Sequence, residues 1–442
     1  MADFSALVWG PWLIVLLFGT HLFLTVRLGF MQRYIIRAIK LSFSKNEGGA
    51  GDVSPFASLM TALAATIGTG NIIGVASAIA MGGPGAVLWM WLTGVFGIAT
   101  KYAEAVLAVK YRVTTPTGEM AGGPMYALER GMNAKWLGMI FAGFATIAAF
   151  GIGNMTQANA VIGQVQARFP DVDPKMLAYS IGATMAVLTA AVILGGIKSI
   201  ARACAWLVPF MAIFYVIGCA LILIKNYAVL PETISLIVTS AFTGQAAVGG
   251  FAGAGIAAAM RFGIARGLFS NESGLGSAPI VAAAAQTRNP VRQALVSATG
   301  TFWDTVVICA MTGLVLVSSG HWKEGLGKAV LTQAAFAELH SIGPIILFIG
   351  LVTFVFSTIL GWSYYGEKSA EYLFGPKVIF PYRLLWVIAV FVGSIAPLPM
   401  VWDFADAMNG LMAIPNLISL IVLSGVIAAE TRTHKNELTG KD

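Results

Sequence analysis

Residues 61–75 read TALAATIGTGNIIGV, and this stretch decides the fold class. It lies inside an apolar run that is long enough to cross a bilayer, yet Gly68 and Gly70 interrupt it near its middle, each at a cost to a helix of about 1 kcal/mol against alanine. Thr66 and Asn71 stand beside the glycines. Broken backbone at membrane depth is tolerated only where it is buried in protein or lines a cavity. The stretch is therefore typical of a binding site built from the ends of two half-helices.

The composition of the chain is that of a membrane protein. Of its 442 residues, 57% are hydrophobic and only 11% are charged, whereas soluble chains carry about 25% charged residues. No long polar segment interrupts the apolar runs, so we expect a single all-α transmembrane domain over residues 1–442. The net charge of +7 comes from Lys and Arg between apolar runs, as the positive-inside rule requires. We therefore expect membrane lipid as a partner and no nucleic acid.

Eleven apolar segments are long enough to span the bilayer. They cover residues 7–26, 55–81, 84–109, 136–165, 176–194, 203–224, 244–266, 292–318, 342–366, 380–397 and 403–429. If they alternate sides, all Lys and Arg fall on one face except Arg168, Lys175, Lys225, Lys323 and Lys328. This bias predicts an outside N-terminus and a cytoplasmic C-terminus in the plasma or inner membrane. It also puts Arg261 and Arg266 on the cytoplasmic face, and Asp403 and Asp406 at the outer end of a span.

The spans are arranged as one leading helix, 7–26, followed by two sets of five, 55–224 and 244–429. A repeat unit of five spans forces the second set to be inverted relative to the first. The second set begins GQAAVGGFAGAGIAAAM, with glycines clustered over residues 249–255. Two glycine-interrupted spans in matching positions indicate a transporter site. The alternative is close helix packing through small residues.

A broken helix offers two kinds of ligand group. Its free N–H groups suit a carboxylate, and its free carbonyls suit Na⁺ or an ammonium group, so an amino acid matches both. We find no acidic or basic residue in the central parts of 55–81, 244–266 or 342–366. The sequence therefore predicts a site without fixed charge and a net-neutral ligand.

Polar and aromatic side chains on other spans are further candidates for this site. Ser357 and Thr358 are adjacent hydroxyls in an apolar run and suit an alkali cation, although such residues also bond back to their own helix. Gln157 either binds a ligand or packs between helices. Phe251 and Trp362 either wall the cavity or pack in the core.

Asp304 is the only carboxylate that we expect deep in the membrane. Such residues are functional by default. Two roles remain open for it, a proton site and an acceptor that holds neighbouring helices. The four histidines are scattered and have no metal spacing, and no nucleophile stands beside a base, so we do not expect an enzyme.

Several motifs resemble those of the sodium:alanine (alanine or glycine:cation) symporter family. They are TALAATIGTGNI, GGPGAVLWMWLTGVFG (82–97), ATKYAEAVLAVKYR (99–112), GGPMYAL (122–128) and GLFSNESGLGSAP (267–279). The resemblance covers essentially the whole chain, with one departure at Leu88, where the family usually has Phe. It implies a leucine-transporter-type fold with a 5+5 inverted repeat, one extra leading helix and a broken first helix in each repeat. It also implies Na⁺-driven uptake of alanine or glycine.

The resemblance also implies roles for residues of the first break. Thr66, Thr69 and Gly70 would contact the substrate, and Asn71 would join either the substrate or the cation set. The Na⁺ ligands would be the carbonyls of Ala64 and Ile67 and the hydroxyls of Ser357 and Thr358. No motif match fixes Gln157, Phe251 or Trp362.

The leading hypothesis is a Na⁺-coupled symporter of small neutral amino acids. Carbonyls around Phe251 and Gly253 are expected to accept from the amine. Phe251 and Trp362 are expected to bound the space for the side chain, so that alanine and glycine fit and leucine does not. The alternative is an H⁺-coupled or uncoupled small-solute channel or facilitator, which would need a continuous polar pore. The sequence decides neither alanine against glycine nor the Na⁺ stoichiometry.

Overall fold

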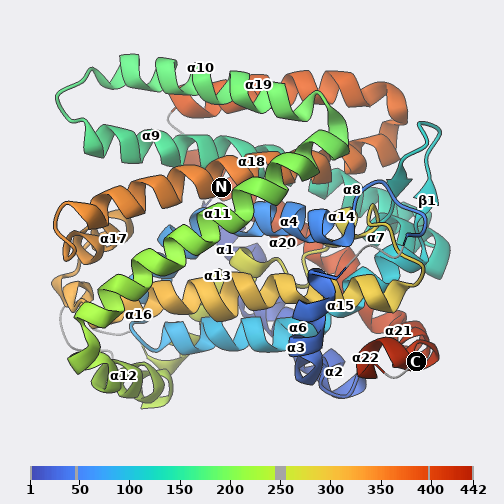
Figure 1. Cartoon of the computed structure of the whole chain (residues 1–442), viewed down its shortest axis with the longest axis horizontal. Helices are drawn as coiled ribbons and strands as arrows, with labels where there is room; N and C mark the ends of the chain where they lie inside the picture. The colour runs from blue at the N-terminus through green and yellow to red at the C-terminus, as the bar shows by residue number, and fades with distance from the viewer. Residues whose placement is uncertain (1, 45–47, 244–254, 397–398, 441–442) are drawn as a thin grey trace.

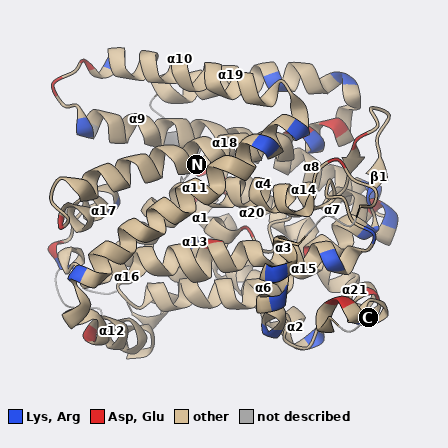
Figure 2. Cartoon of the chain, in the orientation of Figure 1, with Lys and Arg blue, Asp and Glu red and all other residues tan. Residues whose placement is uncertain are grey.

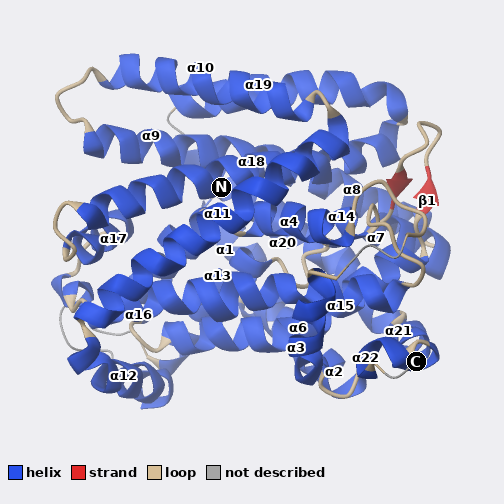
Figure 3. Ribbon diagram, in the orientation of Figure 1, coloured by secondary structure: helices blue, strands red, loops and turns tan. Residues whose placement is uncertain are grey.

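The computed structural model describes residues 2–44, 48–243, 255–396 and 399–440. These residues are helical almost throughout (Figure 1, Figure 3). One small antiparallel hairpin joins strands β1 (Val113–Thr114) and β2 (Met120–Ala121), with Val113 opposite Ala121. The expectation of an all-α fold is therefore confirmed, with this hairpin as the exception.

The helices of the first part of the chain run from the N-terminus to Lys225. They are α1 (Ala2–Val8), α2 (Pro11–Arg27), η1 (Met31–Tyr34), α3 (Ile35–Ser42), α4 (Pro55–Thr66), η2 (Gly70–Gly74), α5 (Val75–Gly82), α6 (Ala86–Lys110), α7 (Pro124–Tyr126), η3 (Ala127–Gly131), α8 (Lys135–Phe150), η4 (Gly151–Met155), α9 (Thr156–Arg168), α10 (Pro174–Ile193) and α11 (Gly196–Lys225).

The helices of the second part follow to the C-terminus. They are η5 (Tyr227–Val229), α12 (Leu230–Thr243), α13 (Ile256–Asn271), α14 (Pro279–Ala282), α15 (Pro290–Thr301), η6 (Phe302–Cys309), α16 (Ala310–Ser318), η7 (His321–Glu324), α17 (Lys328–Ala337), α18 (Ile342–Phe374), η8 (Pro376–Val378), α19 (Ile379–Ile395), α20 (Pro399–Val422), α21 (Ser424–Thr433) and α22 (Lys435–Thr439).

Eight helices in the described ranges are long and apolar enough to cross a membrane, and ten if each of two bent pairs is one span. Most predicted spans coincide with these helices. The predicted span 244–266 is misplaced, because α13 begins at Ile256 and continues past 266 to Asn271. Residues 244–254 lie outside the described residues. The count of eleven and the inverted repeat stay predictions.

The helices differ in how far the rest of the protein covers them. Helix α6 packs against α13 and α15, and α4 packs against α11 and α18. The apolar stretch of α6 is 83% buried, whereas that of α19 is only 28% buried. Figure 1 shows α19 beside α10 along one edge of the molecule. The polar residues of α6 therefore lie inside the protein and not against lipid.

The first break lies where the sequence predicts it. Helix α4 starts at Pro55, where Ser54 caps it by accepting from the N–H of Ala57 at 3.1 Å. The helix ends at Thr66, and the α5 half continues at an angle of 52°. The Asn71 side chain accepts from the N–H of Gly68 at 2.8 Å, which satisfies one of the donors that the break exposes.

A second break follows α13, over residues 272–278. Gly274 and Gly276 both have φ +87°, a conformation that other residues rarely adopt. The Glu104 carboxylate on α6 accepts from their N–H groups at 3.0 and 3.1 Å, and from Asn416 at 2.7 Å. The break is thus held by a carboxylate from a neighbouring helix. The glycine cluster that predicts a break over 249–255 lies, except for Gly255, outside the described residues.

Candidate functional site

The two breaks meet at a cavity of about 20 Å³. This is room for one or two water molecules, so the pocket in this conformation favours a small ligand over a bulky one. Its walls come from both breaks and from α9 and α18. The lining residues include Thr66, Gly68, Thr69, Gly70, Ile152, Gln157, Phe269, Glu272, Thr358 and Trp362.

Five predicted substrate residues lie on this cavity: Thr66, Thr69, Gly70, Gln157 and Trp362. Asn71 does not line it. Its side-chain amide instead donates to Asp304 Oδ1 at 2.7 Å, so it stabilises the break from behind. Phe251 and Gly253 lie outside the described residues.

Gln157 presents a free acceptor in this pocket. Its Nε2 donates to Thr69 Oγ1 at 3.2 Å and to the Ile152 carbonyl at 2.9 Å. Its Oε1 is buried and has no hydrogen-bond partner among the described residues. Because a buried polar atom without a partner costs free energy, this oxygen suits a ligand N–H group.

Glu272 is the site residue that sequence reasoning missed. It stands in the left-handed conformation (φ 56°) directly after α13, it is 3% exposed, and it lines the pocket. Its Oε1 accepts from Trp362 Nε1 at 2.9 Å and its Oε2 from Ser277 Oγ at 2.5 Å. The prediction of a site without fixed charge is therefore wrong. The polar run Ser270–Gly274 after an apolar helix was the available signal.

The sequence predicts that Asp304 is the only buried carboxylate. This prediction is wrong, because Glu104 and Glu272 are buried as well. Asp304 accepts from Asn71, from Ser270 Oγ at 3.0 Å and from Thr305 Oγ1 at 2.7 Å. Because Asn71 belongs to the first break and Ser270 to the end of α13, this carboxylate ties the two breaks together. Its geometry is that of the structural acceptor that the sequence left as one of two possibilities.

The predicted cation ligands come together beside the pocket. Ser357 Oγ lies 3.2 Å from the Ala64 carbonyl, and Thr358 Oγ1 lies 3.4 Å from the Ile67 carbonyl. Both hydroxyls have a shorter contact with the Phe354 carbonyl, at 2.8 and 2.9 Å. A hydroxyl has one proton to donate. If both hydroxyls donate to the Phe354 carbonyl, no proton lies between Ser357 Oγ and the Ala64 carbonyl, or between Thr358 Oγ1 and the Ile67 carbonyl. Oxygens arranged in this way suit a hard cation.

A larger cavity of about 350 Å³ lies on the other side of Phe269. Phe269 lines both cavities, and the Arg266 guanidinium lies 5.8 Å from the centre of its ring. The aromatic ring therefore separates the pocket from this vestibule.

The vestibule corrects the predicted charge assignment. Arg261 and Arg266 line it together with Asp403 and Asp406, so all four residues lie at the same end of the molecule. The sequence put the two arginines and the two aspartates at opposite ends. The reason is the misplaced span, because α13 runs from Ile256 to Asn271 and carries both arginines within it. Figure 2 still shows that many Lys and Arg gather towards the end that carries β1, α21 and the C-terminus.

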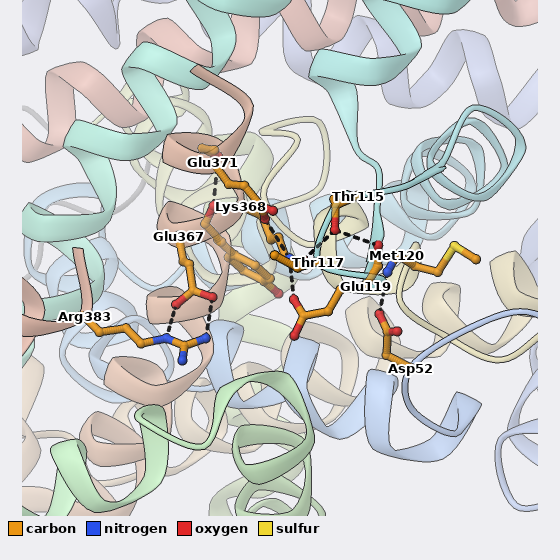
Figure 4. A network of polar contacts seen from close by, with 11 residues as sticks. Asp52, Thr115, Thr117, Glu119, Met120, Glu367, Lys368, Glu371 and Arg383 are labelled. Carbon is orange, nitrogen blue, oxygen red and sulfur yellow. Dashed lines mark hydrogen bonds and ion pairs between the residues drawn. The ribbon is translucent and has the colours of Figure 1, made fainter. Parts of the chain in front are cut away.

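At that end, ion pairs tie the β1–β2 hairpin to α18 (Figure 4). The ammonium of Lys368 is fully buried and contacts Glu119 of the hairpin at 2.6 Å and Glu371 at 2.8 Å. The preceding residue, Glu367, pairs with Arg383 of α19 through two contacts at 2.6 and 2.8 Å. These pairs join the hairpin, α18 and α19 to one another.

The hairpin is also tied to the segment before α4. Asp52 accepts from the N–H of Met120 at 2.8 Å (Figure 4). Burial raises the pKa of Asp52 above its ordinary value, while the Met120 hydrogen bond acts in the opposite direction. Since the hairpin contacts both the entry to the broken helix and α18, it couples the elements that supply the two halves of the candidate cation site.

We expect Lys368→Met to lower the thermal stability of the detergent-solubilised protein strongly. The substitution leaves the carboxylates of Glu119 and Glu371 without their cation, and breaking a buried ion pair costs about 3–5 kcal/mol. Lys110→Met is the matched control, since its pair with Glu430 is more exposed and exposed pairs contribute about 0–1 kcal/mol. Equal melting temperatures for the two variants would contradict this role of Lys368.

The comparison with protein families identifies the chain. The model of the sodium:alanine symporter family matches residues 1–442. The chain belongs to this family. Family membership confirms the resemblance that the motifs predict, and it makes this chain a member of a family of multi-pass membrane transporters.

The names of individual relatives of this symporter family member agree with the family assignment. It is 54% identical to the sodium/alanine symporter AgcS of Methanococcus maripaludis, over 98% of this chain and 97% of that protein. It is 36% identical to the probable sodium/glutamine symporter GlnT of Bacillus subtilis, over 99% and 90% of the two chains. Among solved structures, MhsT in complex with L-phenylalanine aligns with a TM-score of 0.62 at 13% identity, over 87% and 93%. This likeness shows the leucine-transporter-type fold.

Proposed function

We propose that the protein is a secondary active transporter that couples Na⁺ to the uptake of small neutral amino acids, alanine and glycine, by alternating access. The observation that carries this proposal is the set of four oxygens from Ala64, Ile67, Ser357 and Thr358 directly beside the pocket between the two breaks. Thr358 belongs to both. A cation bound there stabilises the wall of the pocket, and a bound substrate stabilises the wall of the cation site.

In the proposed complex, the substrate lies between the two breaks. Its carboxylate meets the N–H groups of Thr69 and Gly70, which by position have no acceptor within the following helix. Its ammonium meets the Glu272 carboxylate and the free Oε1 of Gln157. Glu272 thus takes the role that the sequence gave to carbonyls around Phe251 and Gly253. This pairing needs a ligand with both charges, as an amino acid has.

The proposed architecture has eleven spans in one domain over 1–442, with a leading helix (7–26) and two inverted repeats (55–224 and 244–429). In this arrangement the N-terminus is outside and the C-terminus is cytoplasmic. The matching positions of the two breaks support it, since α4–α5 and α13–α14 each open one set of helices. The uneven distribution of Lys and Arg in Figure 2 supports the orientation.

Trp362 sets the size limit of the proposed substrate. Its ring lines the cavity, and its Nε1 is held by Glu272. We expect Trp362→Ala to strengthen competition by leucine against labelled alanine by about tenfold to a hundredfold, because overpacking costs about 1–3 kcal/mol. Trp362→Phe is the control that keeps the bulk, and it should still exclude leucine. If the wild type already takes leucine as well as alanine, the size argument is wrong.

Binding to the purified protein tests the proposal. By thermodynamic linkage, Na⁺ and alanine must each raise the affinity for the other. We expect alanine to raise the melting temperature in Na⁺ but not in an equal concentration of choline. Ser357→Ala should raise the Na⁺ concentration that this effect requires. An alanine effect that is the same in Na⁺ and choline contradicts sodium coupling, and one that instead depends on pH favours the H⁺-coupled alternative.

A further inference from the structure

Lys101, in the middle of α6, carries a buried charge that the proposed binding reaction does not use. Its side chain belongs to a residue that is only 4% exposed. Its Nζ has no hydrogen-bond partner among the described residues. An ammonium group taken out of water without a partner is costly, so a protein that keeps one there uses it for something other than stability.

Lys101 lines a second cavity, of about 10 Å³, next to the binding pocket. The hydroxyl-bearing residues Ser58, Thr66 and Ser297 also line this cavity. Thr66 lines both cavities, so one side chain separates Lys101 from the substrate space. Ala278 borders the Lys101 cavity, and its neighbour Ser277 donates to Glu272. A short path therefore connects the ammonium with the carboxylate of the pocket.

Three buried carboxylates lie within electrostatic reach of Lys101: Glu104, Glu272 and Asp304. Glu104 accepts from two backbone N–H groups and Asn416 through Oε1, and its Oε2 has no hydrogen-bond partner among the described residues, but Glu104 does not line the substrate pocket. Asp304 is fixed by three side-chain donors. Glu272 has two neutral donors and is the one that lines the substrate pocket. It is therefore the carboxylate whose charge changes partner when a substrate binds or leaves.

We propose that Lys101 is the internal counter-cation of the empty carrier. The inference rests on the proposed function. With substrate bound, the ligand ammonium neutralises Glu272. After substrate and Na⁺ leave, the flexible four-carbon chain of Lys101 brings its ammonium past Thr66 to Glu272. The unloaded protein then changes back to its outward-open conformation without an uncompensated buried carboxylate. Lys101 acts on turnover through Glu272 and does not contact the substrate.

The comparison of net uptake with exchange tests this inference. Exchange of labelled for unlabelled alanine, with saturating Na⁺ and alanine on both sides of a proteoliposome, never passes through the empty carrier. Net uptake down an inward Na⁺ gradient passes through it in every cycle. We expect Lys101→Met to lower net uptake by about tenfold or more, since an unpaired buried charge costs well over 1.4 kcal/mol, and to leave exchange within about twofold.

Folding and the matched control are read in the same preparations. Because the methionine replaces an unpartnered ammonium with an apolar chain, the variant should melt at the same temperature as the wild type or higher. Lys110→Met, on the same helix, should leave both fluxes unchanged. A Lys101→Met protein that fails to fold overturns the inference, because Lys101 is then a structural partner, for example of Glu104. Equal loss of both fluxes, or loss of neither, overturns it as well. If the wild type shows no Na⁺-driven uptake, the proposed function itself fails.

Discussion

Gly68→Ala is expected to raise the Na⁺ concentration for half-maximal alanine uptake by about tenfold to a hundredfold. A Cβ at residue 68 would lie 2.5 Å from Thr358 Oγ1 and 3.5 Å from Thr358 Cβ. A distance of 2.5 Å is too short for a non-bonded contact between carbon and oxygen, so Thr358 must move its hydroxyl to make room for the methyl group. Since that hydroxyl faces the Ile67 carbonyl, the cation site loses a ligand, and interactions with a charged group contribute about 1.5–3 kcal/mol each.

Gly74→Ala is the matched control for this prediction. Its Cβ would have the Thr69 carbonyl at 3.9 Å as its nearest neighbour, although it lies on the same broken helix. We expect its Na⁺ dependence to equal that of the wild type. A Gly68→Ala protein with unchanged Na⁺ dependence would place the cation elsewhere. If both variants raise the required Na⁺ concentration equally, the cause is the added side chain in the broken helix and not the loss of a cation ligand.

Glu272→Gln should weaken alanine binding by about tenfold to a hundredfold. The glutamine keeps the shape and can still accept from Trp362 or Ser277, whose contacts fix the present side chain. It loses the charge that meets the substrate ammonium, and hydrogen bonds to charged groups contribute about 1.5–3 kcal/mol. The dissociation constant of alanine for the purified protein in saturating Na⁺ measures the effect.

The same substitution at Glu104 separates this binding role from a structural one. Glu104 also lies at the second break, but it faces the backbone of Gly274 and Gly276 and not the pocket. We expect Glu104→Gln to change the melting temperature more than the alanine affinity. If Glu104→Gln and Glu272→Gln weaken alanine binding equally, the proposed pairing of Glu272 with the ammonium is wrong.

The first break and several residues of its cavity could be predicted from the sequence because the signal is local. Gly68, Gly70 and Asn71 stand together within one apolar run, and helix depth alone brings Thr358 and Trp362 to the same level. The structure places Thr66, Thr69, Gly70, Gln157 and Trp362 on one cavity. Charge and hydropathy were also enough for the all-helical fold, since each span is read from its own residues.

The second break could not be located in the same way. The glycines over 249–255 are the denser cluster, and glycine content alone does not distinguish close packing from a break. What holds the observed break is the Glu104 carboxylate, which comes from a helix about 170 residues earlier in the chain. Glu104 and Lys101 lie in the last part of an apolar run that ends in charged residues. A hydropathy pattern therefore predicts that they lie near the end of the span, at the membrane surface. Only packing shows that they are buried.

The central claim, that a sodium gradient drives amino-acid uptake through this chain, is tested most directly with the purified protein in sealed proteoliposomes. The measurement is the internal concentration of labelled alanine after an inward Na⁺ gradient is imposed, with and without an ionophore that collapses it. We expect alanine to accumulate above its external concentration and to leak back when the gradient is dissipated. Uptake that is the same in Na⁺ and choline, and that never exceeds the external concentration, would contradict symport.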